Sequence, residues 1–324
     1  MKKIAFLLAG GLLLAQPCAA FAAQHKHHKH VAKAHKHVVK ARPAQVSSQV
    51  TDSKPSRVTS PNLRSNNAVV FDELEQRPIY QKNADEVVPI ASITKLMTAM
   101  VVLDAKLPLD EKITITHDDI DTLRGSHSRL TPGVELTRAE LLKLALMSSE
   151  NRAASALART YPGGTRAAVA KMNEKARALG MQSTRFEDPS GLNSANVSTA
   201  HDLVHMVDAA QGYKLIHQYT TTAGDVVQVS DRRALRYINT NPLVKSDSWD
   251  IRVSKTGYIN EAGRCLVMEA KITQRPVIIV LLDSQGKHTR VGDANRVRQW
   301  MQSSYVNGRG KAVRTADASS YRGS

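Results

Sequence analysis

The sequence predicts an α/β fold of the α+β kind, with an antiparallel sheet of about five strands, flanking helices and a mostly helical subdomain. Strand-like segments lie near both ends of residues 61–305, and helical segments lie between them. Strands from both ends can share one sheet only if the intervening helices pack against it or beside it. About 245 residues is an ordinary size for one folded domain.

The elements follow one another in a simple order. Residues 67–72 and 78–82 are β-like and are separated by a polar turn. A strongly apolar helix begins at Ser92, as its apolar positions indicate: Ile93, Leu96, Met97, Met100 and Val101.

Helices dominate the middle, and strands return at the end. A capping box of Thr137 and Glu140 opens a helix that runs through Met147. Further helices are expected at 152–160, at 165–179 with Gly180 as the C-terminal cap, and from about Ser198 or Thr199. The last elements are strands at 251–258, 264–272 and 277–283, joined by short turns, and a helix at roughly 293–304.

Residues 1–22 have the order of a secretory signal peptide. Lys2 and Lys3 precede an apolar stretch, and Ala20-Phe21-Ala22 provides a cleavage site. The apolar stretch is too short to span a membrane comfortably, and no later stretch approaches the required length. We therefore expect an exported, soluble protein without a transmembrane anchor.

The formal charge of +16 suggests nucleic-acid binding at first sight, but its distribution argues against it. The signal and two tails, 23–60 and 306–324, hold about 12 of these charges, so the expected folded domain at 61–305 is nearly balanced. Residues 23–60 form a basic linker with six histidines, and 306–324 form a second disordered tail. Three interpretations of this linker are open. It is a flexible linker with an electrostatic role, it captures metal through its histidines, or it adheres loosely to an anionic cell envelope.

Cysteine usage excludes an internal disulfide after signal cleavage, because Cys18 lies in the signal and only Cys265 remains. The apolar neighbours of Cys265 favour a small buried hydrophobe over a reactive thiol.

Two S-x-x-K tetrads occur, Ser92–Lys95 and Ser284–Lys287. The second lies in a glycine-containing turn with nothing to fix its side chains. The first begins an apolar helix, so Lys95 lies one turn from Ser92 on the same face. A serine hydroxyl needs a base before it can act as a nucleophile. Lys95 can be that base if burial and a second cation, for which Lys255 is the candidate, lower its pKa.

S-x-N occurs four times, beginning at Ser60, Ser65, Ser149 and Ser194. Only Ser149–Asn151 lies where one apolar helix stops and another begins, a place where a loop can be held rigidly. Ser149 could relay a proton between the lysines and the leaving amine, and Asn151 could hold a substrate amide or Lys95. A plain capping segment is the alternative.

K-T-G occurs once, as Lys255-Thr256-Gly257 on a predicted strand. An extended peptide could pair with that strand, and Lys255 and Thr256 would then meet its carboxylate. Gly257 would remove a side chain where the substrate backbone approaches. The backbone amides of Ser92 and Tyr258 are candidates for an oxyanion hole.

With the three motifs in this order, the chain resembles the low-molecular-mass penicillin-binding proteins, serine D-Ala-D-Ala peptidases of the S11 type. The likeness extends from about Ala68 to Tyr305 and includes DPSGL at 188–192, Asn196 and STAHDL at 198–203. Three details are similar to the D,D-endopeptidase branch of the penicillin-binding protein 7 type. They are the Ser-Glu-Asn motif, SKTGY followed by AGRCL at 262–266, and the lack of a second, β-rich C-terminal domain.

The resemblance implies a β-lactamase/D,D-peptidase-like fold, a periplasmic location and hydrolysis of D-alanyl cross-links in peptidoglycan without cofactor or metal. It implies a Ser92 acyl-enzyme, Lys95 as base, and β-lactams as covalent inhibitors. D,D-carboxypeptidase activity is the close alternative, because the same residues would hold a terminal D-Ala carboxylate.

A β-lactamase and a non-catalytic wall-binding protein also remain open. A β-lactamase would need a glutamate that activates water, and Glu187 is the candidate, although no Glu-x-x-x-Asn spacing surrounds it. A wall-binding protein would use the basic tails. His201 and His205 have i, i+4 spacing, but solvated helix residues are the expected interpretation.

Overall fold

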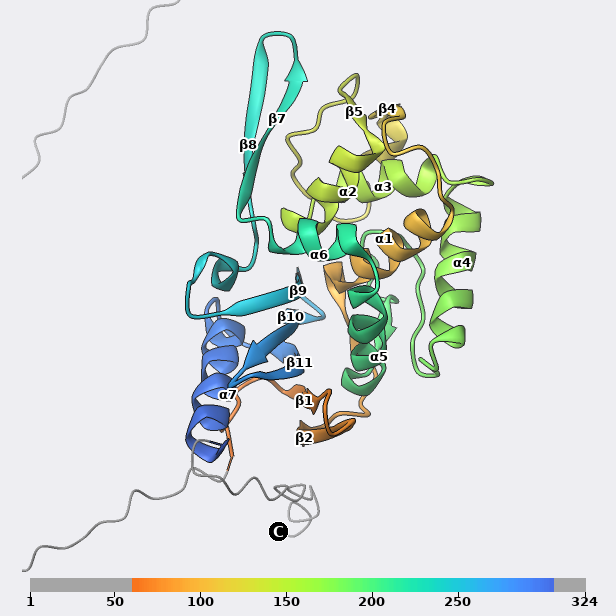
Figure 1. The fold of residues 1–324 in the computed structure, drawn as a ribbon. Coiled ribbons are helices and arrows are strands. Elements are labelled where there is room, and N and C mark those ends of the chain that lie inside the picture. The colour runs from red at the N-terminus through yellow and green to blue at the C-terminus, as the bar shows by residue number, and fades with distance from the viewer. Residues whose placement is uncertain (1–59, 306–324) are drawn as a thin grey trace, which may run out of the picture. The chain divides into compact units, whose positions relative to one another are not determined.

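The computed structural model describes residues 60–305, which form a five-stranded antiparallel sheet with helices on both faces (Figure 1). The sheet has the order β2-β1-β11-β10-β9. Its strands are β1 (Asn67–Asp72), β2 (Arg77–Lys82), β9 (Asp250–Ile259), β10 (Gly263–Ile272) and β11 (Arg275–Ser284). The first strand pairs with the last, which confirms a sheet built from both ends of the domain.

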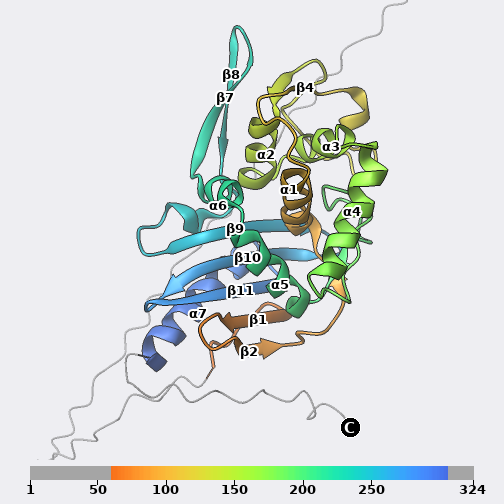
Figure 2. The same ribbon diagram turned by 45° about the vertical axis from the view of Figure 1, so that its right-hand side comes forward.

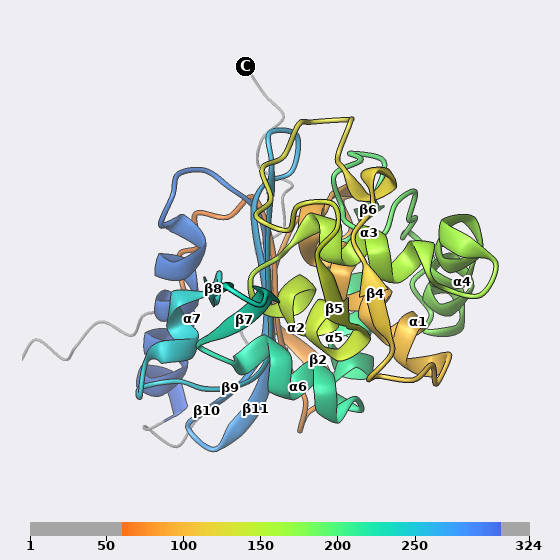
Figure 3. The ribbon, with the colours of Figure 1, turned by 90° about the horizontal axis from the view of Figure 1, so that it is seen from above.

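Alternation along the strands divides the core into two layers. On β11, Ile278 and Val280 face one apolar cluster, whereas Ile279 and Leu281 face the other. Helix α7 (Thr289–Tyr305) packs on the second face, and α5 (Ala200–Gln211) packs on the first. Figure 3 shows the sheet nearly edge-on, with α7 on one side and the other helices opposite. Because both faces are covered, six consecutive residues are buried on each middle strand, Cys265–Ala270 on β10 and Val277–Leu282 on β11.

The helical subdomain surrounds α1 (Thr94–Asp104), which follows the short 3-10 turn η1 (Ala91–Ile93). Nearly every residue of α1 is buried, because α2 (Arg138–Met147), α3 (Asn151–Arg159), α4 (Gly164–Ala178) and α5 surround it. Short pieces complete this part: β3 (Val88–Pro89), β4 (Lys112–Thr114), η2 (His117–Asp119), β5 (Glu135–Thr137) and β6 (Val197–Ser198). A buried α1 fixes the direction in which Ser92 and Lys95 point.

Local capping signals place the helix ends as expected. Thr137 and Glu140 form the capping box, with Glu140 N to Thr137 Oγ1 at 3.2 Å and Thr137 N to Glu140 Oε2 at 2.7 Å. Thr199 caps α5 by accepting from Asp202 N at 3.0 Å. Gly180, at φ +79°, follows the end of α4.

One prominent feature was not predicted: the hairpin of β7 (Gly224–Ser230) and β8 (Arg233–Ile238), which projects beyond the sheet next to the helical subdomain (Figure 2). Helix α6 (Lys214–Thr221) precedes it, and the turn η3 (Pro242–Lys245) follows. Thr240, which follows β8, lies beside Thr256 of the third motif. The hairpin therefore begins and ends near the motifs and extends away from them.

The expectations for the signal peptide, the basic linker and the C-terminal tail fall on residues 1–59 and 306–324, which lie outside the described residues. Between residues 60 and 305, no helix combines the length and the apolar character needed to cross a membrane.

Candidate active site

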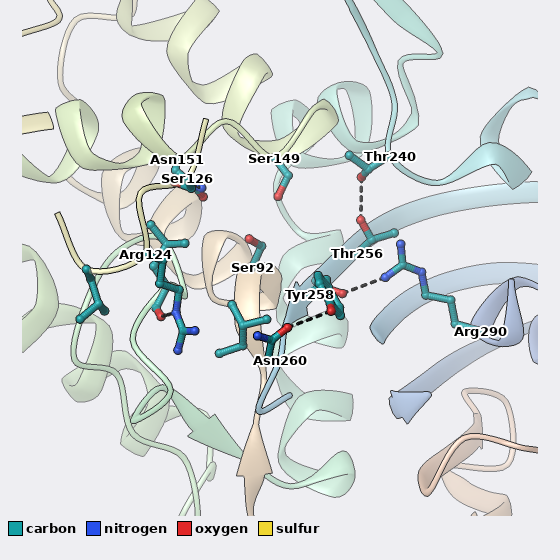
Figure 4. A pocket seen from close by; sticks show the side chains of 14 residues that line it. Ser92, Arg124, Ser126, Ser149, Asn151, Thr240, Thr256, Tyr258, Asn260 and Arg290 are labelled. Carbon is teal, nitrogen blue, oxygen red and sulfur yellow. Dashed lines mark hydrogen bonds between the residues drawn. The ribbon is translucent and has the colours of Figure 1, made fainter. Parts of the chain in front are cut away.

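The three motifs meet in one cleft of about 610 Å³ (Figure 4). Ser92 lies in η1 at the start of α1, and Ser149 and Asn151 lie at the junction of α2 and α3. Thr256 and Gly257 enter the cleft from β9. The cleft therefore lies between the sheet and the helical subdomain, and each motif comes from a different element.

Lys95 is a buried amine in contact with Ser92. Its Nζ donates to Ser92 Oγ at 2.8 Å, to Asn151 Oδ1 at 2.8 Å and to the Ser190 carbonyl at 2.5 Å. Burial lowers the pKa of Lys95 to about 7, while the negative charges of Asp188 and then Glu150 oppose that change. A substantial fraction of the amine is therefore neutral near pH 7 and able to accept a proton.

Of the two expected causes of a lowered Lys95 pKa, burial is confirmed, whereas Lys255 is not among the groups that change it. The influence runs the other way. Burial lowers the pKa of Lys255 well below its ordinary value, and the charges of Lys95 and Arg290 lower it further. Both lysines are only 1% exposed, so two like charges would be costly there.

Ser149 pairs with the second lysine. Lys255 Nζ donates to Ser149 Oγ at 2.8 Å and to the Thr256 carbonyl at 2.9 Å. Within residues 60–305, no hydrogen bond joins Ser149 to Ser92 or Lys95. The site thus holds two hydroxyl–amine pairs side by side, Ser92 with Lys95 and Ser149 with Lys255, rather than one continuous chain.

The backbone is strained beside both hydroxyls. Ala91, next to Ser92, has φ +48°, and Ser149 has φ +62°. Residues with a Cβ rarely adopt this left-handed region, and they keep it only where the surroundings impose it. Packing against β9 and the loop at 188–193 supplies that constraint at Ala91, and Gly257 and Gly191 are the contacting residues.

Gly257 is explained by packing on the nucleophile segment, which differs from the expected approach of a substrate backbone. A Cβ at this position would lie 3.0 Å from Ser92 N, Ile90 O and Ala91 Cβ. At Gly191, which has φ +81°, a Cβ would lie 1.9 Å from the Ala91 carbonyl oxygen. Both glycines let neighbouring backbone approach the Ser92 segment closely.

The loop at 188–193 carries part of the family resemblance, but its role in holding Lys95 was not foreseen. The Asp188 carboxylate accepts from Ser190 N at 2.5 Å, Gly191 N at 2.7 Å and Asn193 N at 2.6 Å. These bonds fix the turn that presents the Ser190 carbonyl to Lys95.

Several cleft residues were missed because no short motif marks them, among them Ser126, Thr240, Arg290 and Arg124. Asn151 Nδ2 donates to Ser126 Oγ at 2.9 Å, and Thr256 Oγ1 donates to Thr240 Oγ1 at 2.7 Å. Arg290 Nη1 donates to the Gly257 carbonyl at 2.8 Å, and Arg124 also lines the cleft. Figure 4 shows Thr240 and Arg290 on the side of Thr256, and Arg124 on the opposite side of the cleft.

The second S-x-x-K tetrad lies outside the cleft. Ser284 is buried and bonded to Ser65 Oγ at 2.7 Å, so the expectation that nothing fixes its side chain is wrong. The partner is a serine and not Lys287. Cys265 is buried as predicted, and burial raises the pKa of its thiol to about 12.

The residues considered for a β-lactamase and for a metal site have other contacts in the structure. Glu187 is exposed and forms an ion pair with Arg185, so it does not face the cleft as a deacylating glutamate would. His201 contacts Asp85 Oδ1 at 2.6 Å and Gln81 Oε1 at 3.0 Å. Across residues 60–305, no three metal-binding side chains gather at one point.

Similarity to known proteins agrees with this geometry. A family model described as D-alanyl-D-alanine carboxypeptidase, peptidase S11, matches residues 54–286. The chain is 47% identical to a D-alanyl-D-alanine endopeptidase of Pseudomonas aeruginosa, over 81% of this chain and 86% of that protein. It is 47% identical to a D-alanyl-D-alanine endopeptidase of Escherichia coli, over 76% of this chain and 80% of that protein.

Solved structures give the same result. The DD-transpeptidase of Streptomyces K15 superposes with a TM-score of 0.69 at 32% identity, covering 75% of this chain and 98% of that chain. A D-alanyl-D-alanine carboxypeptidase of Mycobacterium tuberculosis superposes with a TM-score of 0.68 at 29% identity, covering 76% of this chain and 94% of that chain.

Proposed function

The chain belongs to the peptidase S11 family of D-alanyl-D-alanine carboxypeptidases, and we propose that it is an endopeptidase that hydrolyses D-alanyl–diaminopimelate cross-links in peptidoglycan. The proposal depends above all on the 2.8 Å contact between Lys95 Nζ and Ser92 Oγ, in a cleft that all three motifs border. The two 47% identical relatives named endopeptidases favour cross-links over terminal D-alanine as the substrate.

In the proposed reaction, Ser92 Oγ attacks the D-alanyl carbonyl carbon and its proton moves to the neutral Lys95 amine. The backbone amides of Ser92 and Tyr258 stabilise the oxyanion that forms. When the C–N bond breaks, the Lys95 ammonium gives up the proton that it took from Ser92, and Ser149, held by Lys255, relays this proton to the leaving amine, so Lys95 is neutral again. Water then attacks the Ser92 ester with Lys95 as the base, and the serine is regenerated.

The carboxylate of the leaving group fits the end of the cleft where β9 enters. Thr256 and Arg290 line this end, and Lys255 lies buried beneath it. A guanidinium is charged at every relevant pH, so it attracts a carboxylate even when Lys255 is neutral. Asn151 holds Lys95 through its amide oxygen and is placed to contact the substrate amide.

The same geometry supports covalent inhibition by β-lactams, because their carbonyl would acylate Ser92 and their carboxylate would occupy the Thr256 end. We place the reaction in the periplasm, because residues 1–22 have the features of a signal peptide. The basic tails provide loose association with the envelope.

Two substrates test the proposal. Purified enzyme is incubated with a cross-linked dimer muropeptide and with a free pentapeptide, and the products are separated by chromatography. We expect the dimer to be converted to monomers. If only the pentapeptide loses its terminal D-alanine, the protein is a D,D-carboxypeptidase, the alternative that the family description favours.

The Ser92→Ala variant is the matched control for chemistry. It should lose both hydrolysis and labelling by a fluorescent penicillin, while its circular dichroism spectrum remains that of the wild type. Rapid turnover of a chromogenic cephalosporin by the wild type would instead indicate a β-lactamase.

A further inference from the structure

An ion pair between Arg124 and Glu261 joins the two walls of the cleft. Arg124 belongs to the loop between η2 and β5, and Glu261 belongs to the turn between β9 and β10. Arg124 Nη2 lies 2.9 Å from Glu261 Oε1, and the two side chains are 24% and 47% exposed. The pair is therefore within reach of a molecule that occupies the cleft.

Arg124 is held from behind, independently of Glu261. Its Nε donates to the Leu192 carbonyl. The Asp121 carboxylate accepts from the backbone amides of Leu123 at 2.9 Å, Arg124 at 3.0 Å and Ser126 at 2.7 Å. These bonds fix the loop that carries Arg124, so the guanidinium is already in place before any substrate binds.

The direction of the substrate follows from the proposed function, on which this inference rests. If the leaving-group carboxylate lies at Thr256, a peptide pairing with β9 runs antiparallel to it. Its acyl-donor part then extends past Tyr258 and Asn260, which both line the cleft. The turn with Glu261 follows directly, so the acyl donor reaches the Arg124–Glu261 pair.

We propose that Arg124 and Glu261 form a subsite for a zwitterionic side-chain end on the residue that precedes the D-alanine of the acyl donor. A diamino acid of the diaminopimelate type ends in an ammonium and a carboxylate on one carbon when that end is not itself cross-linked. Arg124 binds the carboxylate and Glu261 binds the ammonium, so both charges of the substrate are matched at the mouth of the cleft.

The ion pair suits this role because breaking it, or letting its charged groups contact a substrate as well, costs little free energy. An ion pair in contact with water contributes little net stability. The guanidinium has five N–H donors, and the contacts to Leu192 and Glu261 use Nε and Nη2. Leu123 beside it lines the cleft and is 64% exposed, which offers an apolar surface to the methylene stem of the substrate.

The test changes the substrate and the protein together. Three dimer muropeptides are compared: the native one, one with the free side-chain carboxylate of the donor amidated, and one with the free amine acetylated. For the wild type we expect kcat/KM to fall about tenfold with either modification. Arg124→Ala should lower kcat/KM on the native dimer about tenfold and show no further loss on the amidated one. Glu261→Gln should also lower kcat/KM on the native dimer about tenfold and show no further loss on the acetylated one.

A fluorescent penicillin separates recognition from folding, because its acyl part carries no diamino acid. Its rate of acylation of Ser92 should stay within about twofold of the wild type in Glu261→Gln, which leaves the contact between Arg124 and the Leu192 carbonyl in place. Lys171 and Glu174 form a matched ion pair on α4, 2.6 Å apart, and neither residue lines the cleft. Lys171→Ala and Glu174→Gln should leave every substrate unaffected.

Two results would overturn the subsite. One is a wild type that cleaves all three dimers equally well. The other is a parallel loss of penicillin acylation and dimer hydrolysis in Glu261→Gln, which would mean that the ion pair only joins the loop to the turn. If the wild type cleaves pentapeptide and no dimer, the endopeptidase proposal fails by itself. The subsite is then tested with the same two modifications on the pentapeptide, which has the same donor residue.

Discussion

The protonation of one residue, Lys95, governs the proposed chemistry. Its amine touches Ser92 Oγ and is enclosed so completely that burial brings its pKa to about 7. Asp188 and Glu150 prevent a larger decrease, because each negative charge favours the ammonium form. Glu150 is itself buried, with Ser128 Oγ at 2.7 Å from its carboxylate. The middle residue of the Ser-Glu-Asn motif therefore adjusts the base without touching Ser92.

We expect the rate constant for acylation by a fluorescent penicillin to rise with pH through about 7, as Lys95 loses its proton. Glu150→Gln removes a charge that raises the Lys95 pKa, so this rise should move to lower pH by about half a pH unit. A stopped-flow pH profile measures it. Glu187→Gln, at an exposed position outside the cleft, should leave the profile in place. A shift to higher pH in Glu150→Gln would contradict this account of the base.

At the scale of elements, the site depends on how closely β9 packs against η1. The glycine of the third motif allows this contact, because a Cβ there would meet Ser92 N and the Ile90 carbonyl at 3.0 Å. The strained φ of Ala91 shows that the nucleophile segment is held by its neighbours rather than by its own preference. The sheet and the helical subdomain therefore fix the position of Ser92 together.

Gly257→Ala should separate β9 from η1 by a few tenths of an ångström and lower the acylation rate constant by about tenfold or more. Gly292→Ala is the control, because its Cβ would meet only the Arg296 side chain, at 3.5 Å or more, within α7. That control should keep wild-type acylation, with equal or slightly higher thermal stability. Unchanged acylation in Gly257→Ala would show that the close contact does not position Ser92.

The elements that the sequence predicted correctly have local causes. Thr137 and Glu140 form their capping box within one turn, and Ser92 and Lys95 meet because i and i+3 share a helix face. The β7–β8 hairpin was missed because its turn, Asp231-Arg232, lacks the glycine that marks tight hairpins. Local sequence signals therefore predict most of the helices and strands but do not predict the β7–β8 hairpin.

At the scale of the whole molecule, long-range contacts complete the site, and these could not be predicted from short motifs. The Ser190 carbonyl reaches Lys95 across 95 positions, and Arg290 reaches the Gly257 carbonyl from the last helix. These contacts exist only because β9, β10 and β11 bring the end of the chain back beside η1. The three motifs gave the main residues of the cleft, whereas the groups that orient them depend on the completed fold.

The same sheet buries a carboxylate that the proposed reaction does not use. Glu269 lies on β10, between Val253 of β9 and Ile278 of β11, on the face covered by α5. It is buried, and neither carboxylate oxygen has a hydrogen-bond partner within the described part of the chain. Burial and, to a smaller extent, the nearby charge of Glu73 raise the pKa of Glu269 to about 7.

This carboxylate should make the stability of the domain depend on pH. Because the pKa of Glu269 is raised in the folded state, the folded protein binds more protons than the unfolded chain between about pH 4.5 and 7. The contribution of Glu269 to the free energy of unfolding is therefore most favourable at low pH and declines as the pH rises to about 7. The positive charge of Arg252 opposes the increase in the Glu269 pKa, and the negative charge of Asp250 adds to it.

Glu269→Gln keeps the shape of the side chain and removes its titration, so we expect the variant to gain about 1–2 kcal/mol over the wild type at pH 8. At pH 5 the difference should be small, because the wild-type carboxyl is then protonated in the folded state. Urea unfolding at both pH values measures it, with Glu174→Gln on the exposed face of α4 as the control. A variant that is less stable than the wild type at pH 8 would mean that ionised Glu269 is stabilised in the fold, since an uncompensated buried charge can only oppose folding.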